Sequence, residues 1–504
     1  MRIKLLLAMS LAVAMAVGAR ADVKPALVFT DNAVLQQNMA VPVWGTAEPG
    51  EAVTVSFGGQ NKTTKADLKG DWSVKLGKLK ASADGRALTI TGKNSVTLTN
   101  LVVGEVWICS GQSNMEFPLL RSRNGTNAAV ASDDPLLRLF LVQKATADEP
   151  LKSVAGSWKP CDKNSAPGFS AVGYFFGRDL RAARKVPVGL IGTYWGGSPA
   201  ETWTQPDVLK NNPALAGIVS NYEKRVKSWD PEKEKNSFLA RQTKWSNDVV
   251  KAKAEGRPPP SAVYMARDPK ADAHRPGCLY NAMIAPLAPY AIRGATWYQG
   301  ESNAGRPAQY ETLLPEMIGN WRRAFGVGDF PFLIVQIATY AGQPPTIREA
   351  QLHIAKKTKN TAMIVSADWG ENNDIHPTHK EPVGQRLALA ARNLAYDDDV
   401  AYTGPVFEKM KISGPKAVLT FDNAVGGLVA KDGELQSFTI SEYGSSNFVP
   451  AKATIVGRKK IEVQAGSVKV PGAVRYGWTN YFKADLFDKS GLPASPFRTD
   501  DWPL

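Results

Sequence analysis

Between residues 22 and 100 the chain alternates apolar and polar positions in short runs. Ala52–Phe57 and Ala87–Thr91 are two such runs. Successive side chains of a strand point to opposite faces of a sheet, so a period of two is typical of strands buried on one side. Gly, Pro, Asn and Asp separate the runs, as in Glu48–Gly50, and these residue types favour turns. The pattern predicts a small N-terminal β-sandwich-like domain at residues 22–100.

From residue 101 to 398 apolar runs of strand length alternate with longer stretches of helical periodicity. The predicted strands are Val102–Cys109, Val188–Trp195, Ile292–Tyr298, Phe332–Ala338 and Thr361–Ala367. The predicted helices are Tyr174–Lys185, Ala308–Phe325, Thr346–Thr358 and Val383–Tyr396. Continuous apolar strands separated by helices favour a parallel sheet that is covered on both faces. The region is therefore predicted to be an α/β unit whose ligands bind beyond the carboxyl ends of its strands.

Two further segments flank or interrupt this unit. Residues 205–273 are polar and Lys-rich, and helical periodicity around Val219–Val226 and Ser237–Ala254 predicts an inserted helical subdomain. Two interpretations of it stay open, a lid beside the binding cleft and a solvated excursion on the surface. Short β patterns return after Asp399, and they predict a C-terminal β region at 399–504 that packs on the α/β unit.

Composition changes the picture mainly through charge. The 504 residues include 61 Lys and Arg against 47 Asp and Glu, a formal charge of +14, in an otherwise ordinary globular composition. Disorder, collagen-like repeats and a polytopic membrane protein are excluded. A basic surface favours anionic partners such as acidic glycans. Because no run of Lys and Arg exceeds three residues, we expect no nucleic-acid partner. The oligomeric state is left open.

The first 21 residues have the pattern of a secretory signal. Arg2 and Lys4 precede the apolar run Leu5–Val17, and Ala19-Arg20-Ala21 is a small-x-small cleavage site. The run is short for a membrane span, so a cleaved signal peptide is favoured over an anchor. We therefore expect a secreted or periplasmic protein that begins at Asp22. Three cysteines do not make a disulfide scaffold, and whether Cys161 and Cys278 pair stays open.

Candidate chemistry begins at the end of the first predicted parallel strand. There Val106–Cys109 runs into Ser110-Gly111-Gln112-Ser113-Asn114-Met115. A serine on such a turn can expose its hydroxyl above the sheet, and nearby backbone N–H groups can face an oxyanion. Ser113 is thus a candidate nucleophile, although an ordinary turn or helix-capping serine has the same local pattern.

A base for this serine is offered by the loop after the last predicted strand. In an extended loop Asp374 and His376 point the same way, and Pro377 keeps His376 out of helical geometry. Asp374 could hold one ring nitrogen of His376 while the other faces Ser113. A rival interpretation is a metal-dependent hydrolase that uses Asp374, His376 and His379, with Asp368 as a further ligand.

Two more loops follow predicted strands and converge on the same edge. Gly192–Ser198 could bring the Gly197 N–H to an oxyanion, because glycine allows close approach of the backbone. Trp297–Asn303 places the amides of Gln299 and Asn303 after another strand, where either could donate to the oxyanion. Ordinary turns and hydrogen bonds within the loops would also account for these residues taken singly.

Taken together, these blocks resemble those of a known family. Gly111–Met115, Trp297–Asn303 and Asp374–Pro377 are similar to the signature blocks of the sialate O-acetylesterase family, a branch of the SGNH hydrolases. Val34-Leu35-Gln36-Gln37 with Val43-Trp44-Gly45 and the tail Gly491–Arg498 extend the resemblance over nearly the whole chain after the signal, except for residues 205–273.

The resemblance implies an SGNH or flavodoxin-like parallel sheet and removal of O-acetyl groups from sugars through an acyl-enzyme, without a cofactor or metal. It implies Ser113 as nucleophile, His376 as base and Asp374 as orienting acid, with Asp368 or Glu371 as alternative acids. It further implies an oxyanion hole made from the Ser113 and Gly197 N–H groups and Gln299 or Asn303. The predicted contacts to substrate are Gln112, Trp195, Glu301 and Arg306.

Substrate choice stays open between two classes of acetylated glycan. Net charge and three arginines near the blocks suit a sialoside or an acetylated uronic-acid polymer, namely Arg121, Arg123 and Arg306. Four tryptophans that could stack on sugars suit neutral xylan or xyloglucan as well, namely Trp195, Trp203, Trp297 and Trp369. A non-catalytic glycan-binding protein on the same fold is the remaining alternative.

Overall fold

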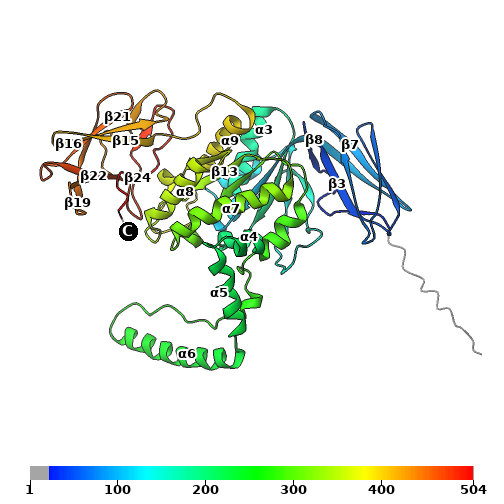
Figure 1. Ribbon diagram of the computed structural model, residues 1–504, viewed down its shortest axis with the longest axis horizontal. Coiled ribbons are helices and arrows are strands. Elements are labelled where there is room, and N and C mark those ends of the chain that lie inside the picture. Colours follow the sequence, from blue (N-terminus) through cyan, green and yellow to red (C-terminus); the bar gives the residue numbers. More distant parts are fainter. Residues whose placement is uncertain (1–21, 503–504) are drawn as a thin grey trace, which may run out of the picture.

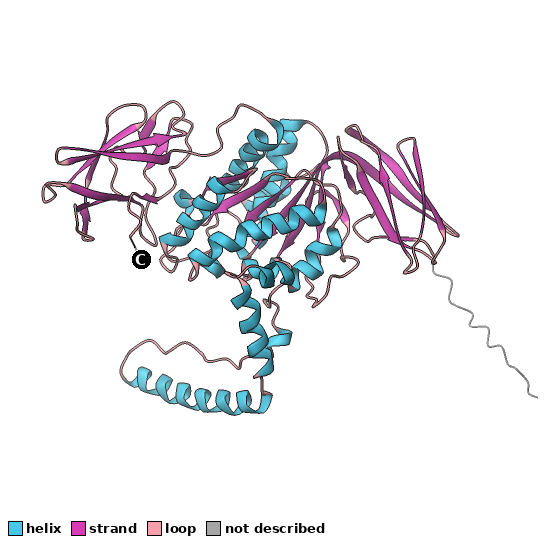
Figure 2. Cartoon of the chain, in the orientation of Figure 1, coloured by secondary structure: helices cyan, strands magenta, loops and turns pink. Residues whose placement is uncertain are grey.

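The computed structural model describes residues 22–502, so the predicted signal segment lies outside the described residues. Three parts follow one another along the long axis of the molecule, a β unit, a central α/β unit and a second β unit (Figures 1 and 2). Among the described residues, no helix is both long and apolar enough to cross a membrane.

The N-terminal part consists of two small groups of paired strands. One is a separate sheet, and the other is continuous with the central sheet of the protein. Its strands are β1 (Lys24–Pro25), β2 (Val34–Gln36), β3 (Val41–Thr46), β4 (Ala52–Phe57), β5 (Gln60–Lys65), β6 (Asp71–Leu76) and β7 (Ser82–Thr91). The next strand, β8 (Ser95–Gly111), is longer than the predicted strand. Its first half pairs with β7, and from residue 105 onward it pairs with β11 (Val188–Tyr194) of the central sheet. The predicted domain boundary at residue 100 thus lies within one continuous strand.

The central sheet has the strand order β9-β11-β8-β12-β13-β14, with β10 antiparallel at one edge. Its remaining strands are β9 (Asp134–Leu141), β10 (Trp158–Cys161), β12 (Gly294–Tyr298), β13 (Phe332–Gln336) and β14 (Thr361–Val365). All neighbours within that order except the β10 pair are parallel. The predicted parallel α/β fold is confirmed. The sequence patterns missed β9 and β10. Strand β9 was missed because Arg138 interrupts its apolar run, and the structure buries this arginine against the carbonyl oxygens of Asn32 and Asn100.

Helices cover both faces of this sheet (Figure 2). Helix α3 (Ala171–Arg184) packs against α9 (Glu381–Tyr396), and α7 (Pro307–Phe325) packs against α8 (Pro345–Lys357). The predicted helices agree with these to within a few residues at each end. Two short helices, α1 (Ser113–Glu116) and α2 (Gly125–Val130), follow β8. All three cysteines are free and buried, so Cys161 and Cys278 do not pair.

The insertion forms an arm that extends away from the body of the protein (Figure 1). It contains α4 (Pro206–Asn211), α5 (Ala216–Lys227) and α6 (Pro231–Ala254). Helix α6 begins earlier than predicted, because the Asp230 carboxylate accepts hydrogen bonds from the N–H groups of Glu232 and Lys233. Ala252 is the one buried residue of α6, so this helix contributes little to the core.

The C-terminal part consists of small antiparallel sheets beside α8 (Figure 1). Its strands are β15 (Val406–Ser413), β16 (Lys416–Asp422), β17 (Leu428–Ala430), β18 (Phe438–Glu442), β19 (Phe448–Pro450), β20 (Lys452–Ile455), β21 (Lys460–Gln464), β22 (Pro471–Tyr476), β23 (Leu486–Asp488) and β24 (Phe497–Arg498). The buried Arg348 guanidinium of α8 donates to the carbonyl oxygens of Thr479 and Asn480. Arg498 forms an ion pair with Glu349 at 2.9 Å. These bonds join the C-terminal part to the central unit.

Candidate active site

The predicted site residues meet where three parallel strands end at the same level. Gly111 of β8 lies in register with Tyr194 of β11 on one side and with Tyr298 of β12 on the other. The strands that lie between β8 and β12 in the chain are on one side of β8, and β12 and the later strands are on the other side. Open α/β sheets form ligand crevices at such a point. The three loops that follow these strands therefore converge on one crevice.

The turn after β8, residues 111–116, is called the nucleophile turn here. Gly111 has φ of +141°, and a Cβ there would lie 2.2 Å from the carbonyl oxygen of Tyr298. Glycine is therefore required for the chain to bend sharply beside β12. The bend starts α1 at Ser113, whose Oγ lies 2.8 Å from Nε2 of His376. The predicted serine and histidine are thus brought to hydrogen-bond distance from positions 263 residues apart.

His376 lies in the loop of residues 371–379, called the base loop here. Its backbone N–H donates to Oδ1 of Asp374 at 2.8 Å, and its Nδ1 lies 3.6 Å from the same oxygen. Burial lowers the pKa of His376, and nearby Lys380 and Arg121 lower it further, whereas Asp374 opposes the shift. The imidazole is therefore neutral at neutral pH, the form in which Nε2 can accept a proton.

The alternative acids have other partners. Both carboxylate oxygens of buried Asp368 accept hydrogen bonds from Arg386 at 2.7 Å. Glu371 accepts a hydrogen bond from the N–H of Thr378. Of the three carboxylates considered, Asp374 is the one placed beside His376.

The rival metal set is not assembled. The ring of His379 stacks on Trp369 with centroids 4.4 Å apart, and its Nε2 contacts Arg123. Within residues 22–502 no three His, Cys, Asp or Glu side chains are placed to hold a metal ion together. In the described residues, the base loop therefore places His376 beside Ser113 and does not form a set of metal ligands.

The loop after β11 lies directly against Ser113. A Cβ on Gly196 would be 3.5 Å from the Cβ of Ser113, and the Gly196 N–H donates to Oε2 of Glu116 at 2.6 Å. The next residue, Gly197, has φ of +73°, and its N–H has no hydrogen-bond partner in the described part of the chain. Within the described residues, the Gly197 N–H is thus a donor without a partner. Gly197 follows Gly196, which contacts Ser113, in the chain.

The two amides expected to complete the oxyanion hole form hydrogen bonds with neighbouring loops. Gln299 is fully buried, and its Nε2 donates to Oδ1 of Asn303 at 2.7 Å and to the carbonyl oxygen of Ser198 at 3.3 Å. Buried Asn303 donates to Glu201 at 2.9 Å. Both amides hold neighbouring loops together, and both N–H groups of Gln299 are used in doing so.

Three of the four predicted substrate contacts form hydrogen bonds or ion pairs with neighbouring protein groups. Gln112 is buried and accepts a hydrogen bond from the N–H of Ser302. Glu301 accepts a hydrogen bond from Asn114 at 2.6 Å, and Arg306 pairs with Glu201 at 2.7 Å. Trp195 is half-buried beneath the Lys144 amine, 5.2 Å from its ring centroid. Two of the predicted stacking residues, Trp203 and Trp297, are fully buried against each other and cannot reach a sugar.

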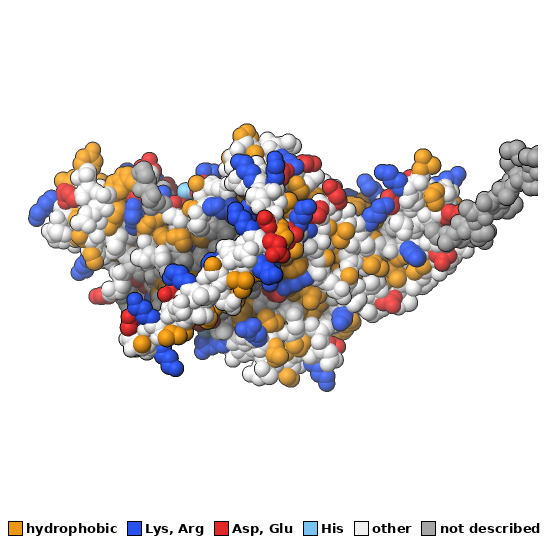
Figure 3. Space-filling model, turned by 90° about the horizontal axis from the view of Figure 1, so that it is seen from below, with side chains coloured by type: hydrophobic (Ala, Val, Ile, Leu, Met, Phe, Trp, Pro, Cys, Tyr) orange, Lys and Arg blue, Asp and Glu red, His pale blue; other side chains and the backbone are white. Residues whose placement is uncertain are grey.

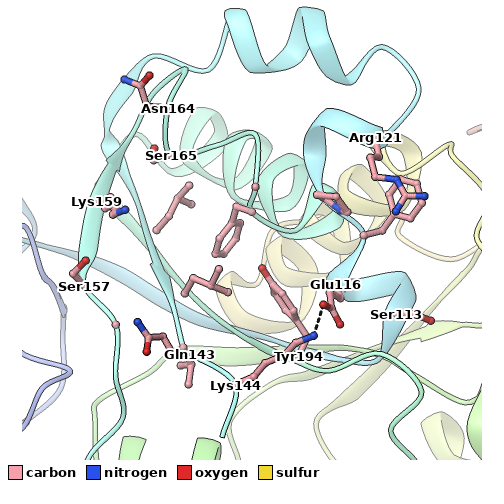
Figure 4. A pocket seen from close by; sticks show the side chains of 18 of the residues that line it. Ser113, Glu116, Arg121, Gln143, Lys144, Ser157, Lys159, Asn164, Ser165 and Tyr194 are labelled. Atoms are coloured by element: carbon pink, nitrogen blue, oxygen red, sulfur yellow. Dashed lines mark hydrogen bonds and ion pairs between the residues drawn. The ribbon is translucent and has the colours of Figure 1, made fainter.

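A groove of about 840 Å³ opens beside Ser113 and His376 (Figure 4). Its basic lining residues are Arg121, Lys144 and Lys159. The only acidic one, Glu116, is ion-paired with Lys144. On the face of the molecule seen from below, Lys and Arg are spread widely and do not gather in one patch (Figure 3). The groove is far larger than an acetyl group and carries excess positive charge.

Sequence patterns missed three residues that the structure places at the centre of the site. Asn114 donates to Glu301 and to the carbonyl oxygen of Ile375, and its Oδ1 accepts a hydrogen bond from Lys380. Glu116 holds Gly196. Asn114 and Glu116 stand beside the nucleophile in the sequence, and their nearness to Ser113 was the available signal. Lys380 carries no such signal, because lysines are usually exposed.

Comparisons with known proteins identify the family of the chain. The family model described as carbohydrate esterase, sialic acid-specific acetylesterase, matches residues 270–393. A carbohydrate acetylesterase from Xanthomonas citri is 34% identical, with a TM-score of 0.80 over 95% of this chain and 100% of that chain. The chain belongs to the sialic acid-specific acetylesterase family of carbohydrate esterases. The resemblance noted in the sequence is confirmed, and the protein is a carbohydrate O-acetylesterase.

Curated relatives cover nearly the same span. The sialate O-acetylesterase of Rattus norvegicus is 28% identical over 90% of this chain and 90% of its own. That of Homo sapiens is 28% identical over 92% of this chain and 90% of its own. The family model contains the loop of Gln299 and the base loop of the esterase, whereas the nucleophile turn lies before it.

Proposed function

We propose that the esterase uses Ser113 as nucleophile, with His376 as its base. The observation that carries the proposal is the 2.8 Å contact between Ser113 Oγ and His376 Nε2. His376 takes the hydroxyl proton as Oγ attacks the acetyl carbonyl carbon. The proton then passes to the departing sugar oxygen, and Ser113 remains as its acetyl ester. Water, deprotonated by His376, cleaves this ester and releases acetate and free Ser113.

Asp374 is proposed as the acid that orients His376. Support comes from its bond to the His376 backbone and from the 3.6 Å separation of Oδ1 and Nδ1. The negative charge of Asp374 stabilises the imidazolium that forms when His376 takes the serine proton. The oxyanion of the tetrahedral intermediate is proposed to lie near the backbone N–H groups of Ser113 and Gly197. A side-chain donor from residues 299–303 is not part of this proposal.

The substrate is proposed to be an O-acetylated glycan that carries a carboxylate. Arg121 and Lys159 line the groove and form no ion pair within residues 22–502. The relatives from Rattus norvegicus and Homo sapiens are sialate O-acetylesterases, which supports acetylated sialic acids as the substrate. Acetate release from acetylated sialosides should therefore exceed release from acetylated xylan. Arg121→Gln should raise KM for the sialoside about tenfold, as expected for the loss of one charge-assisted pair, without changing turnover of a neutral aryl acetate.

The direct test of the mechanism is Ser113→Ala. Acetate release should fall by at least about 10³-fold, because the acyl-enzyme can no longer form. A labelled fluorophosphonate should modify the wild-type serine, and peptide mass mapping should locate the adduct on Ser113. An active Ser113→Ala protein, or an adduct on another residue, would overturn the proposal.

Residues 1–21 are proposed to be a signal peptide that is removed on export, so that the mature chain begins at Asp22. The basic start, apolar run and small-x-small site support this. The intact mass of protein recovered from the periplasm or medium should correspond to a chain that begins at Asp22. A full-length mass in that fraction would contradict the proposal.

A further inference from the structure

A closed polar cluster lies behind the serine and histidine. Asn114 is its centre, with its Nδ2 donating to Oε1 of Glu301 at 2.6 Å and its Oδ1 accepting from the Lys380 amine. The same Nδ2 donates to the carbonyl oxygen of Ile375 at 3.0 Å. An amide thus connects a carboxylate and an ammonium group that do not contact each other directly.

This cluster is buried to an extent that is unusual for charged side chains. Lys380 is 1% exposed and lies under the rings of Phe117 and Tyr298, at 5.0 Å and 5.3 Å from their centroids. The second carboxylate oxygen of Glu301 is buried without a partner. Replacing such groups with apolar residues of similar size is often neutral or stabilising. Stability alone therefore gives little reason for a lysine and a glutamate at these positions.

The position of the cluster supplies a reason. Asn114 follows Ser113 in the nucleophile turn, and Ile375 precedes His376 in the base loop. Glu301 belongs to the loop after β12, and Lys380 lies immediately before α9. The cluster consequently connects the two segments whose separation sets the distance between Ser113 Oγ and His376 Nε2.

The cluster also acts on His376 through charge. Burial lowers the pKa of Lys380 to about 7, opposed by Glu301, Asp374 and Glu371. Burial raises the pKa of Glu301. Below about pH 7 the positive charge on Lys380 lowers the pKa of His376, as Arg121 does, while Asp374 raises it. These are the charged groups that face Lys380 and His376 from the surrounding loops and helices.

We propose that Lys380 is a positioning residue of the esterase, which acts through Asn114 to hold Ser113 against His376 and through its charge to keep His376 in the basic form, with Glu301 as its counter-ion. The proposal rests on the proposed function, because it requires Ser113 and His376 to be the reacting pair. It assigns Glu301 a role in supporting Lys380 rather than in contacting substrate.

The test is the pH profile of Lys380→Met with a neutral aryl acetate. kcat should fall about 10–100-fold through misplacement of the serine, while KM changes by less than about threefold. The acid limb of kcat/KM reports the pKa of free-enzyme His376 and should move to higher pH, because a positive charge beside it is lost. The matched control is Lys416→Met, which removes a half-buried lysine paired with Glu462 far from the site. It should leave kcat and the acid limb unchanged.

Glu301→Gln provides a second, isosteric test that holds even where Lys380→Met fails to fold. Loss of the counter-ion lowers the pKa of Lys380 further, so the acid limb should again move to higher pH. The double variant should cost no more than the worse single variant, because the residues act as one unit. A wild-type acid limb in folded Lys380→Met or Glu301→Gln would refute the proposal. Failure of the proposed function would instead be seen as an active Ser113→Ala protein.

Discussion

The nucleophile turn and the base loop face each other across 2.8 Å but are held in different ways. Asn114 and Met115 of the turn are fully buried, and Gly111 lies wedged against β12. The base loop is largely accessible, and the Asp374 side chain is 56% exposed. Its fixed points are the Arg386 pair of Asp368, just before the loop, and the bond from Asn114 to Ile375.

The serine and the histidine are therefore held in place by different kinds of interaction. The serine is placed by the sheet itself, so changes in the turn should disturb folding and catalysis together. The histidine is placed by a few polar anchors on an exposed loop, so changes there should disturb catalysis alone. This separation can be tested by comparing activity with thermal stability for matched variants of the two segments.

Gly111→Ala should have the largest effect. The added Cβ would overlap the Tyr298 carbonyl, and the positive φ is unfavourable for alanine, so β8 and β12 must move apart. We expect loss of activity together with a fall in Tm of several degrees or failure to fold, measured by calorimetry and acetate release. Gly305→Ala, where a Cβ meets nothing within 4 Å, is the control and should retain both properties. A stable, fully active Gly111→Ala protein would contradict the assigned role of the sheet.

His376→Ala should abolish activity and leave the fold intact. Serine without its base is a poor nucleophile, so kcat should fall by at least about 10³-fold, similar to Ser113→Ala. The Tm should change by no more than about 2 °C, because the ring is partly exposed. A large fall in Tm would show that the base loop is as tightly coupled to the core as the nucleophile turn.

Asp374→Asn should have an intermediate effect, about 10–100-fold on kcat, because the base remains but loses its orienting charge. Asp374 raises the pKa of His376, so the variant should move the acid limb of kcat/KM to lower pH, opposite to Lys380→Met. Asp368→Asn is the comparison. Breaking its buried pair with Arg386 should cost about 3 kcal/mol of stability. A pH shift in Asp368→Asn and none in Asp374→Asn would identify Asp368 as the acid.

The wild-type profile itself should show a smaller effect. The pKa of His376 is lowered by its surroundings, so the acid limb of kcat/KM should have its midpoint below the ordinary histidine value of about 6.5. Activity should therefore persist at mildly acidic pH. A midpoint above 6.5 would mean that the base loop is more solvated than the structure describes.

Shortening the arm should have the smallest effect on chemistry. Residues 229–267 can be replaced by a Gly/Ser linker, since the two chain segments that flank them approach each other, with Nη2 of Arg225 3.9 Å from Oδ2 of Asp272. Turnover of an aryl acetate should stay within about tenfold, a barrier change of about 1.4 kcal/mol. Activity on an acetylated glycan should fall further if the arm shapes substrate choice. Equal losses on both substrates would leave the arm a structural role, and no loss on either would support a surface excursion.

Much of the fold could be predicted from periodicity. The central strands β8, β11, β12, β13 and β14 and the helices α3, α7, α8 and α9 have continuous apolar or helical patterns, because they are buried by the elements next to them. Strand β10, with the sequence Trp-Lys-Pro-Cys, has too little pattern to be distinguished from a loop. Its place at the edge is set by its partner β9.

The candidate site was predictable where function needs an unusual local sequence. Ser113 and the Asp374–His376 pair stand out because each follows an apolar strand. The hydrogen-bond partners of Gln299 and Asn303 could not be predicted, because they come from loops that are distant in sequence. Lys380 could not be found, since only the folded protein shows that this lysine is buried beneath two aromatic rings.

The length of β8 has a consequence for how the protein loses its structure. One strand of 17 residues is hydrogen-bonded to β7 in its first half and to β11 in its second half. Unfolding of the N-terminal part would remove the hydrogen-bond partner of the first half of β8, the strand that precedes Ser113. A chain that begins at residue 101 would leave residues 101–104 of β8 without their partners in β2 and β7. The first two parts of the esterase should therefore melt in a single calorimetric transition, with equal calorimetric and van't Hoff enthalpies.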